Sequence, residues 1–214
     1  MFFIVGVSVI GEQHRRYNER LADYWGCKYN HNVCMNEETD DYVIGGFKIN
    51  SNRLLLIVAD GAGGSKKGKI GAQEATKGAL STKLHDDGIF TVQSAFRNAL
   101  KNLISISQQS GEELTAYATT LTVTYIINGI CYAGGIGDGA VIVLEPSNRL
   151  RVLVEPIKGE YFNETDFITS REYIDIIENG VHVNTNECRG TAIITDGLWP
   201  VLIKCKNEYI PYER

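Results

Sequence analysis

The chain has 214 residues, of which 43% are hydrophobic and 22% are charged, and its formal net charge at pH 7 is -5. These values are ordinary for a folded globular protein and exclude an intrinsically disordered chain. The mildly acidic balance argues against a protein dedicated to binding nucleic acid.

The first predicted strand covers Phe3–Ile10. This stretch is apolar, but it has neither a basic leader nor a cleavage site and is too short to cross a bilayer. We therefore expect no membrane segment and a cytoplasmic location. β-Branched residues predict further strands, namely Tyr42–Ile49, Leu54–Ala59, Ala118–Ile127, Ile130–Ala133, Ala140–Leu144, Leu150–Val154 and Thr191–Thr195.

Two helices are predicted in the middle of the chain, over Lys69–Leu84 and Val92–Gln108. The first has a face of small residues, Ala72, Ala75 and Ala79, which favours close packing. The second has Thr91 as its expected N-cap and Gly111 just beyond its end. No repeat or linker interrupts the chain, so we expect a single domain over residues 1–214.

The element order is strands, two helices and then many strands, which differs from regular βαβ alternation. Asn128-Gly129 and Asp138-Gly139 have the composition of hairpin turns, whereas Asp87-Gly88 is interpreted as a simple turn. Together these features predict an α+β fold with a largely antiparallel sheet.

Five cysteines stand at positions 27, 34, 131, 188 and 205 without a Cys-x-x-Cys pair. Their number and spacing indicate neither a disulfide framework nor a zinc ribbon, so free thiols are the simpler interpretation. Cys27, His31 and Cys34 could be imagined as zinc ligands, but the usual pair spacing is missing.

The segment Gly63–Ile70 (GGSKKGKI) is one residue short of a phosphate-binding P-loop. Ile70 replaces the hydroxyl residue that would hold magnesium, and the Asp60 carboxylate would repel bound phosphates. The element order is also wrong for a nucleotide-binding fold, so a P-loop protein is a disfavoured alternative.

Three apolar strands deliver an Asp-Gly pair at their ends, at Asp60, Asp138 and Asp196. Carboxylates held at strand ends can converge at a sheet edge, and hard cations such as Mg²⁺ or Mn²⁺ prefer such oxygen-rich sites. Asp-Gly is also a common turn pair, and for Asp138 the hairpin interpretation remains equally open.

Six segments in order resemble the metal-dependent protein phosphatases of type 2C, in particular their compact bacterial branch. The segments are GEQHRRYNERLADYW, VADGAGGSKKGKIGAQEA, ATTLTVTYI, GGIGDGAVIVL, KGEYFNETDFIT and AIITDGLWP. The resemblance implies an αββα sandwich of two mainly antiparallel sheets flanked by helices. It also implies hydrolysis of phosphoserine and phosphothreonine in protein substrates with two Mn²⁺ or Mg²⁺ ions, and a cognate Ser/Thr kinase as a further partner in bacterial signalling.

Carried over to this chain, the resemblance assigns Asp60 as the residue that bridges both metals, with the Gly61 carbonyl completing one coordination shell. Asp196 would bind one metal directly and Asp23 would hold the other through water. Asp138 matches the position of a third, weaker metal in bacterial members.

The basic residues His14, Arg15, Arg16 and Arg20 are candidates for binding the substrate phosphate or protonating the leaving group, with His14 and Arg16 preferred for the phosphate. The family pattern also places a further metal-binding aspartate after the last motif, whereas no aspartate follows Gly197 here. The family's C-terminal helix and strand are accordingly expected to be missing. Either this sequence is C-terminally short, or a metal ligand has been lost. In the second case the alternative function is a catalytically impaired module of the same fold that binds or regulates a phosphoprotein. The sequence indicates no oligomeric state.

Overall fold

The computed structural model describes residues 1–9, 23–36, 41–156, 165–198, 202–205 and 209–211. The strands are β1 (Phe2–Val9), β2 (Asp23–Tyr29), β3 (Asn32–Met35), β4 (Asp41–Ile49), β5 (Arg53–Asp60), β6 (Leu121–Ile127), β7 (Ile130–Ile136), β8 (Ala140–Leu144), β9 (Leu150–Val154), β10 (Asn184–Glu187), β11 (Gly190–Ile194), β12 (Ile203–Cys205) and β13 (Tyr209–Pro211). The helices are α2 (Gly68–Leu80), α3 (Gly88–Ser110) and α4 (Arg171–Asn179), with 3-10 turns η1 (Leu114–Tyr117) and η2 (Asp196–Leu198).

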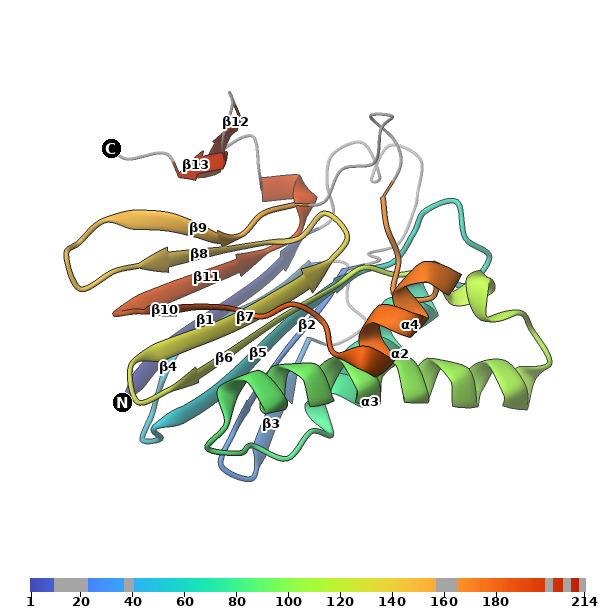
Figure 1. Ribbon diagram of the computed structural model, residues 1–214, viewed down its shortest axis with the longest axis horizontal. Coiled ribbons are helices and arrows are strands. Elements are labelled where there is room, and N and C mark those ends of the chain that lie inside the picture. The colour runs from blue at the N-terminus through green and yellow to red at the C-terminus, as the bar shows by residue number, and fades with distance from the viewer. Residues whose placement is uncertain (10–22, 37–40, 157–164, 199–201, 206–208, 212–214) are drawn as a thin grey trace.

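A six-stranded sheet in the order β10-β7-β6-β5-β2-β3 forms the centre of the molecule. Helices α2 and α3 cover one face of this sheet, and the smaller sheets β1-β4 and β11-β8-β9 lie on the other side (Figure 1). All strand pairings in the described residues are antiparallel. The predicted α+β sandwich of mainly antiparallel strands is therefore confirmed.

The sequence of β5 is a continuous apolar run because this strand is buried on both faces. Leu55, Ile57 and Ala59 pack into the helix-facing core, whereas Leu54 and Leu56 pack into the inter-sheet core on the opposite face. Because alternate side chains of a strand point to opposite faces, a strand buried on both faces needs apolar residues at every position.

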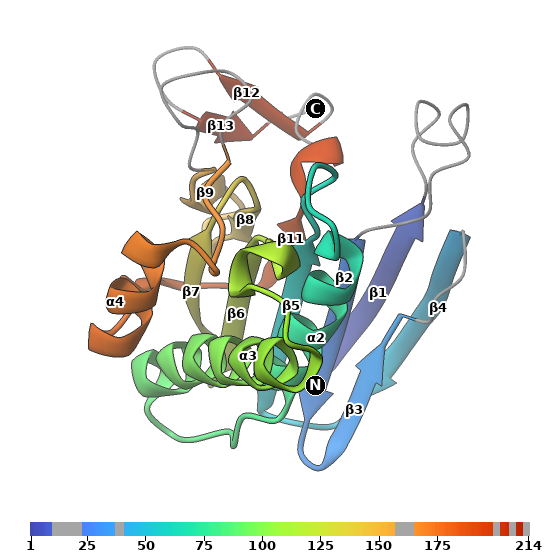
Figure 2. The ribbon, with the colours of Figure 1, turned by 90° about the vertical axis from the view of Figure 1, so that its right-hand side faces the viewer.

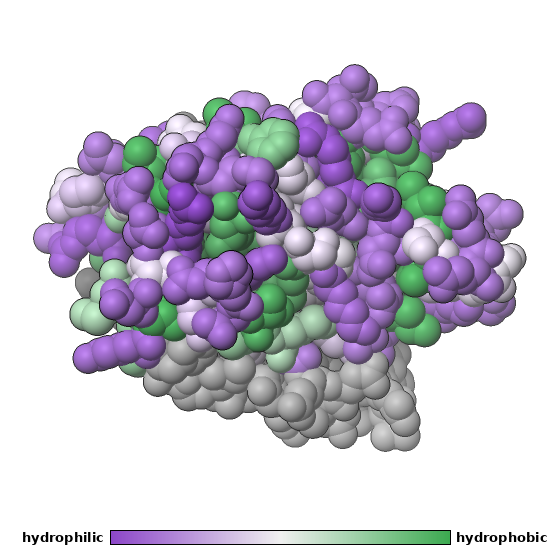
Figure 3. Space-filling view, turned by 90° about the horizontal axis from the view of Figure 1, so that it is seen from below, coloured by the Kyte–Doolittle hydropathy of each residue, from purple (hydrophilic) through white to green (hydrophobic). Residues whose placement is uncertain are grey.

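Helices α2 and α3 lie side by side against the sheet (Figure 2). The predicted small-residue face of α2 is confirmed, since Ala72, Ala75 and Ala79 are all completely buried. The helices approach so closely that a Cβ atom on Gly78 would lie 2.6 Å from the Asn98 carbonyl oxygen. Seen from the α3 side, the outer surface is mainly polar with smaller apolar areas (Figure 3), as is normal for a solvated face.

The predicted helix boundaries need two corrections. Helix α2 ends at Leu80 rather than Leu84, and Lys28 Nζ donates 2.9 Å to the Leu80 carbonyl oxygen at this end. Helix α3 begins four residues earlier than predicted because Asp87, interpreted as a simple turn, is its N-cap and accepts a 2.9 Å bond from the Phe90 N–H. Thr91, the predicted cap, lies inside the helix. The helix ends at Ser110, and Gly111, predicted to lie just beyond the end, is its C-cap with a φ of +69°.

The two predicted hairpins have different outcomes. Asn128 and Gly129 have φ values of 51° and 79° and connect the paired strands β6 and β7, as predicted. The hairpin prediction at Asp138-Gly139 is wrong, because β7 and β8 belong to different sheets. This segment instead carries the chain from the central sheet to the second layer of strands.

The second layer is divided by a cavity of about 440 Å³ between β1 and β11. Residues of both strands line it, and residues of β2, β5 and β6 and of the segments at 129 and 188–189 also contribute. Within the described residues, β1 pairs only with β4 and β11 only with β8. Each of these two strands therefore has one edge without a strand partner. No helix in the described residues is long and apolar enough to cross a membrane.

Candidate metal centre

Asp23 and Asp60 are direct partners across β2 and β5. Their neighbours Tyr24 and Ala59 pack into the helix-facing core. Because side chains alternate along a strand, both carboxylates are placed on the opposite face, toward the second layer of strands. The contact is thus a consequence of strand register, which sets two acidic residues opposite each other at one end of the sheet.

Asp138 and Asp196 reach the same end of the molecule from the second layer. Asp138 lies in the connection from β7 to β8 and accepts a 2.9 Å hydrogen bond from Thr165 Oγ1. Asp196 is the first residue of η2, just after β11. Both carboxylates are close enough to act electrostatically on Asp60. The structure therefore brings together all four aspartates that the sequence singled out.

The electrostatic environment of Asp60 disfavours its charged form. Burial of the carboxyl, followed by the charges of Asp23, Asp196 and Asp138, raises the pKa of Asp60 to about 9, and a hydrogen bond with Asp23 adds to the increase. Like charges that converge in a poorly solvated place oppose ionisation unless a cation compensates them.

The donor chemistry of this cluster fits a hard divalent cation. Carboxylate oxygens and backbone carbonyls are the ligands that Mg²⁺ and Mn²⁺ prefer, and several negative charges converge at a partly buried point. In the part of the chain that the structure describes, however, no three Asp, Glu, His or Cys side chains already form a closed ligand group. The donor atoms of these residues are therefore of the type that Mg²⁺ and Mn²⁺ bind, and Asp23 and Asp60 are register partners within the group.

The backbone of Asp60 is held by two threonines that sequence reasoning did not identify as part of the site. The Asp60 N–H donates a 3.0 Å bond to Thr120 Oγ1, and Thr119 Oγ1 donates a 2.8 Å bond to the Asp60 carbonyl oxygen. The Thr120 N–H donates to that same oxygen at 2.9 Å. Both threonines are buried. Both lie in the motif ATTLTVTYI, just before β6, but nothing in this motif indicated the contact.

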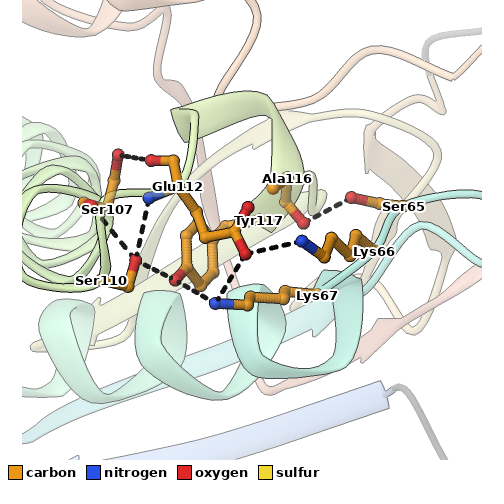
Figure 4. Close-up of polar contacts among 8 residues, drawn as sticks. All are labelled: Ser65, Lys66, Lys67, Ser107, Ser110, Glu112, Ala116 and Tyr117. Atoms are coloured by element: carbon orange, nitrogen blue, oxygen red, sulfur yellow. Dashed lines mark hydrogen bonds and ion pairs between the residues drawn. The ribbon is translucent and has the colours of Figure 1, made fainter.

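Hydrogen bonds connect the loop after Gly61 to η1 (Figure 4). Ser65 Oγ and the Lys67 N–H both donate to the Ala116 carbonyl oxygen, at 2.6 and 2.9 Å. Lys66 Nζ and Lys67 Nζ approach Glu112 Oε1 at 2.7 and 3.5 Å. Lys66 and Lys67 are therefore engaged with a carboxylate, whereas the lysine that matches the P-loop pattern is Lys69.

Close packing inside this loop also argues against the P-loop alternative. A Cβ atom on Gly61 would lie 2.3 Å from the Gly68 carbonyl oxygen, and one on Gly68 would lie 2.4 Å from the Ala62 carbonyl oxygen. The loop thus folds onto itself rather than opening as a cradle for phosphates. Its glycines serve this close backbone approach.

The predicted phosphate-binding residues His14, Arg15, Arg16 and Arg20 lie outside the described residues. The imagined zinc group of Cys27, His31 and Cys34 is not formed, since no closed ligand group occurs in the described ranges. Cys27 and Cys34 instead face each other across β2 and β3.

The fold and the carboxylate cluster define a class of protein: a two-layered antiparallel sandwich with an acidic site at the ends of its strands. Among solved structures of this class, the chain resembles the serine/threonine phosphatase Stp1 from Staphylococcus aureus, with a TM-score of 0.59, 16% identity, and coverage of 92% of this chain and 76% of that chain. It also resembles the catalytic domain of the serine threonine protein phosphatase PstP in complex with two manganese ions, with a TM-score of 0.58, 16% identity and coverage of 92% and 78%. A bacterial serine phosphatase gives a TM-score of 0.57 at 16% identity, with coverage of 92% and 78%.

The sequence matches the protein phosphatase 2C family over residues 35–212, and the chain belongs to this family. The family consists of metal-dependent protein phosphatases, which are hydrolases that act on phosphoproteins. No protein with a curated description matches the sequence significantly. At 16% identity, the likeness to these solved structures shows the fold alone.

Proposed function

We propose that this protein is an active phosphatase that hydrolyses phosphoserine and phosphothreonine in protein substrates. One observation carries the proposal: four aspartates from separate parts of the chain converge on one end of the sandwich, where burial and the charges of the other three raise the pKa of Asp60 to about 9. A bound divalent cation would compensate these converging charges, which otherwise favour the protonated form of Asp60.

We propose that Asp60, the Gly61 carbonyl and Asp196 bind Mn²⁺ or Mg²⁺ directly, that Asp23 does so through water, and that Asp138 holds a weaker third ion. The Asp23–Asp60 contact and the placement of Asp196 after β11 support this assignment. His14 and Arg16 are proposed to bind the substrate phosphate, as the family resemblance implies.

A pair of divalent cations bound there would activate a water molecule for in-line attack on phosphorus and neutralise the developing charge. The protein's own part is to hold the ligands. Strand register holds Asp23 against Asp60, while Thr119 and Thr120 fix the Asp60 backbone. The hydrogen bonds to η1 hold the loop that follows Gly61. Ligands held in this way need little rearrangement when the ions bind.

The substrate is proposed to be a phosphorylated protein in the cytoplasm, made by a cognate Ser/Thr kinase, with residues 1–214 acting as a single phosphatase domain. The structure has free thiols at Cys27, Cys34, Cys131 and Cys188, as is usual for cytoplasmic proteins.

The direct test is release of phosphate from a phosphothreonine peptide with and without Mn²⁺. We expect metal-dependent turnover that falls more than ~100-fold in Asp60→Asn, because even groups that only orient a metal ligand cost ~10–100-fold when changed. Asp175→Asn, an exposed carboxylate change on α4, is the matched control and keeps full activity. Absence of turnover in the unchanged protein would refute the proposal.

The alternative, a catalytically impaired module that binds a phosphoprotein, is favoured by one observation: the described residues contain no closed group of three ligands. Calorimetric titration with Mn²⁺ separates the two functions. Two tight sites support the active enzyme. A single weak site, together with phosphopeptide binding that survives without turnover, supports the module.

A further inference from the structure

Four of the five cysteines gather in the inter-sheet core as two pairs. Cys27 lies opposite Cys34 across β2 and β3, and Cys131 lies near Cys188 where β7 meets the end of β10. In each pair one thiol is completely buried and its partner is only partly buried. The proposed phosphatase chemistry uses none of these thiols.

The pair Cys131 and Cys188 has the closer chemical relationship. Cys131 is the register partner of Asn186, and the Cys188 N–H donates a 2.8 Å bond to the Gly129 carbonyl oxygen. Cys188 therefore occupies the position diagonal to Cys131 on the same face of the sheet. The two side chains are joined by a hydrogen bond.

Their environments give the two thiols different reactivities. The hydrogen bond from Cys131 lowers the pKa of the Cys188 thiol, whereas the same bond and burial raise the pKa of Cys131. Cys188 also lines the cavity of about 440 Å³ between β1 and β11 and is only partly buried, so it is the more accessible of the two thiols. A reactive cysteine needs both thiolate character and access, and Cys188 is favoured over Cys131 in both respects.

We propose that Cys131 and Cys188 form a reversible disulfide when the protein meets a hydroperoxide such as hydrogen peroxide. The Cys188 thiolate attacks one peroxide oxygen, the O–O bond breaks, and Cys188 sulfenic acid and hydroxide are formed. The Cys131 thiol then attacks the Cys188 sulfur, the S–O bond breaks, and water leaves with the thiol proton. Overall, two thiols and one hydrogen peroxide give one disulfide and two waters. A dithiol reductant reverses the reaction by thiol–disulfide exchange.

Such a bridge would connect the central sheet to the strand that leads to the acidic cluster. Cys188 lies two residues before β11, and Asp196 lies two residues after the end of that strand. The bridge would tie this end of β11 to β7, in addition to the single backbone bond from Cys188 to Gly129.

Cys27 and Cys34 provide a matched comparison pair within the same core. Burial, together with the charge of and a hydrogen bond with Cys34, raises the pKa of Cys27 to about 12, so this thiol is a poor nucleophile. We expect the pair at 27 and 34 to react more slowly with peroxide than the pair at 131 and 188.

The test uses the reduced full chain, treated with an equimolar amount of hydrogen peroxide, alkylated and mapped by peptide mass spectrometry. We expect a linked peptide that joins Cys131 to Cys188 and disappears after treatment with dithiothreitol. Cys188→Ser should abolish the link and slow thiol loss by roughly tenfold, since the thiolate is the reacting species. Cys131→Ala should stop the reaction at a sulfenic acid on Cys188, which dimedone traps.

Cys34→Ser is the matched control and should leave the rate and the linked peptide unchanged. Circular dichroism of each variant shows whether it is folded, and Cys188→Ser, at a partly buried position, decides the test if Cys131→Ala does not fold. A first disulfide between Cys27 and Cys34, or equal oxidation rates in Cys188→Ser and the unchanged protein, would overturn the proposal.

Discussion

At the scale of single residues, Asp60 combines two properties that rarely occur together in a stable protein. Its carboxyl is poorly solvated, and three further carboxylates act on it. A carboxyl with a raised pKa keeps its proton in the folded state at a pH where the unfolded chain, with an ordinary pKa of about 4, has released it. The residue therefore links folding, pH and metal binding in one place.

This linkage predicts how the metal-free protein responds to pH. Between about pH 5 and about pH 9 the folded state binds more protons than the unfolded state, so its free energy of unfolding falls as the pH rises. A saturating cation replaces the proton and should stabilise the protein more at about pH 8 than at about pH 6. Thermal unfolding with a chelator or with Mn²⁺ measures both effects.

Asp60→Asn removes the titrating group and should flatten the pH dependence of the melting temperature in the chelator. A steep pH dependence that persists in this variant would assign the effect to another group.

Thr120 supplies a second prediction at this scale. Thr120→Val removes the acceptor of the Asp60 N–H, which should cost about 1–3 kcal/mol of stability and lower kcat by displacing the Asp60 backbone. Thr120→Ser keeps the hydroxyl and should retain most activity. Thr124→Val is the matched control, because the buried Thr124 hydroxyl has no hydrogen-bond partner among the described residues. Chemical denaturation and steady-state kinetics distinguish these outcomes; equal losses in Thr120→Val and Thr124→Val would contradict the assigned role.

At the scale of elements, the contact between α2 and α3 depends on the absence of side chains. Gly78 lets α2 approach within van der Waals contact of the α3 backbone. Both helices also cover the helix-facing core of the central sheet, so their spacing sets how well that core is filled.

Gly78→Ala should therefore destabilise the protein by about 1–3 kcal/mol, even though alanine is the better helix former. The new Cβ atom would lie 2.6 Å from the Asn98 carbonyl oxygen, and backbone cannot move aside cheaply. Gly190→Ala is the control, because its Cβ atom would make only an ordinary 3.9 Å contact with Leu144. Urea denaturation measures both changes, and a neutral or stabilising Gly78→Ala would show that the helices can separate without cost.

At the scale of the whole molecule, the apolar strands were predictable and the polar ones were not. Strands β8 and β9 were predicted with their observed bounds because β-branched and apolar residues fill them. Strands β2 and β10 contain charged or amide residues and form through pairing with β5 and β7. Helix α4 was missed because it is short and Ile177 is its one completely buried side chain among those described. Such elements depend on tertiary contacts that no local pattern reveals.

The acidic cluster was predictable in its members and not in its geometry. Aspartates at apolar strand ends pointed to a shared site, and the family resemblance supplied Asp23. Only the sheet order shows that Asp23 and Asp60 face each other and that Asp138 connects two sheets rather than closing a hairpin. Thr119 and Thr120 escaped notice because a threonine pair before a strand has no distinctive sequence signal.

The divided second layer has a consequence for behaviour in solution. Strands β1 and β11 each present an edge without a strand partner in the described residues, and Phe3 and Val5 on β1 are 66% and 57% exposed. Exposed apolar strand edges are templates for pairing between molecules, which a lysine on the edge suppresses. We expect the average molar mass measured by light scattering to rise with protein concentration, and we expect Val5→Lys to reduce this rise. Ile176→Lys, at a similarly exposed apolar position on α4, should have no effect if strand edges rather than general hydrophobicity cause the association.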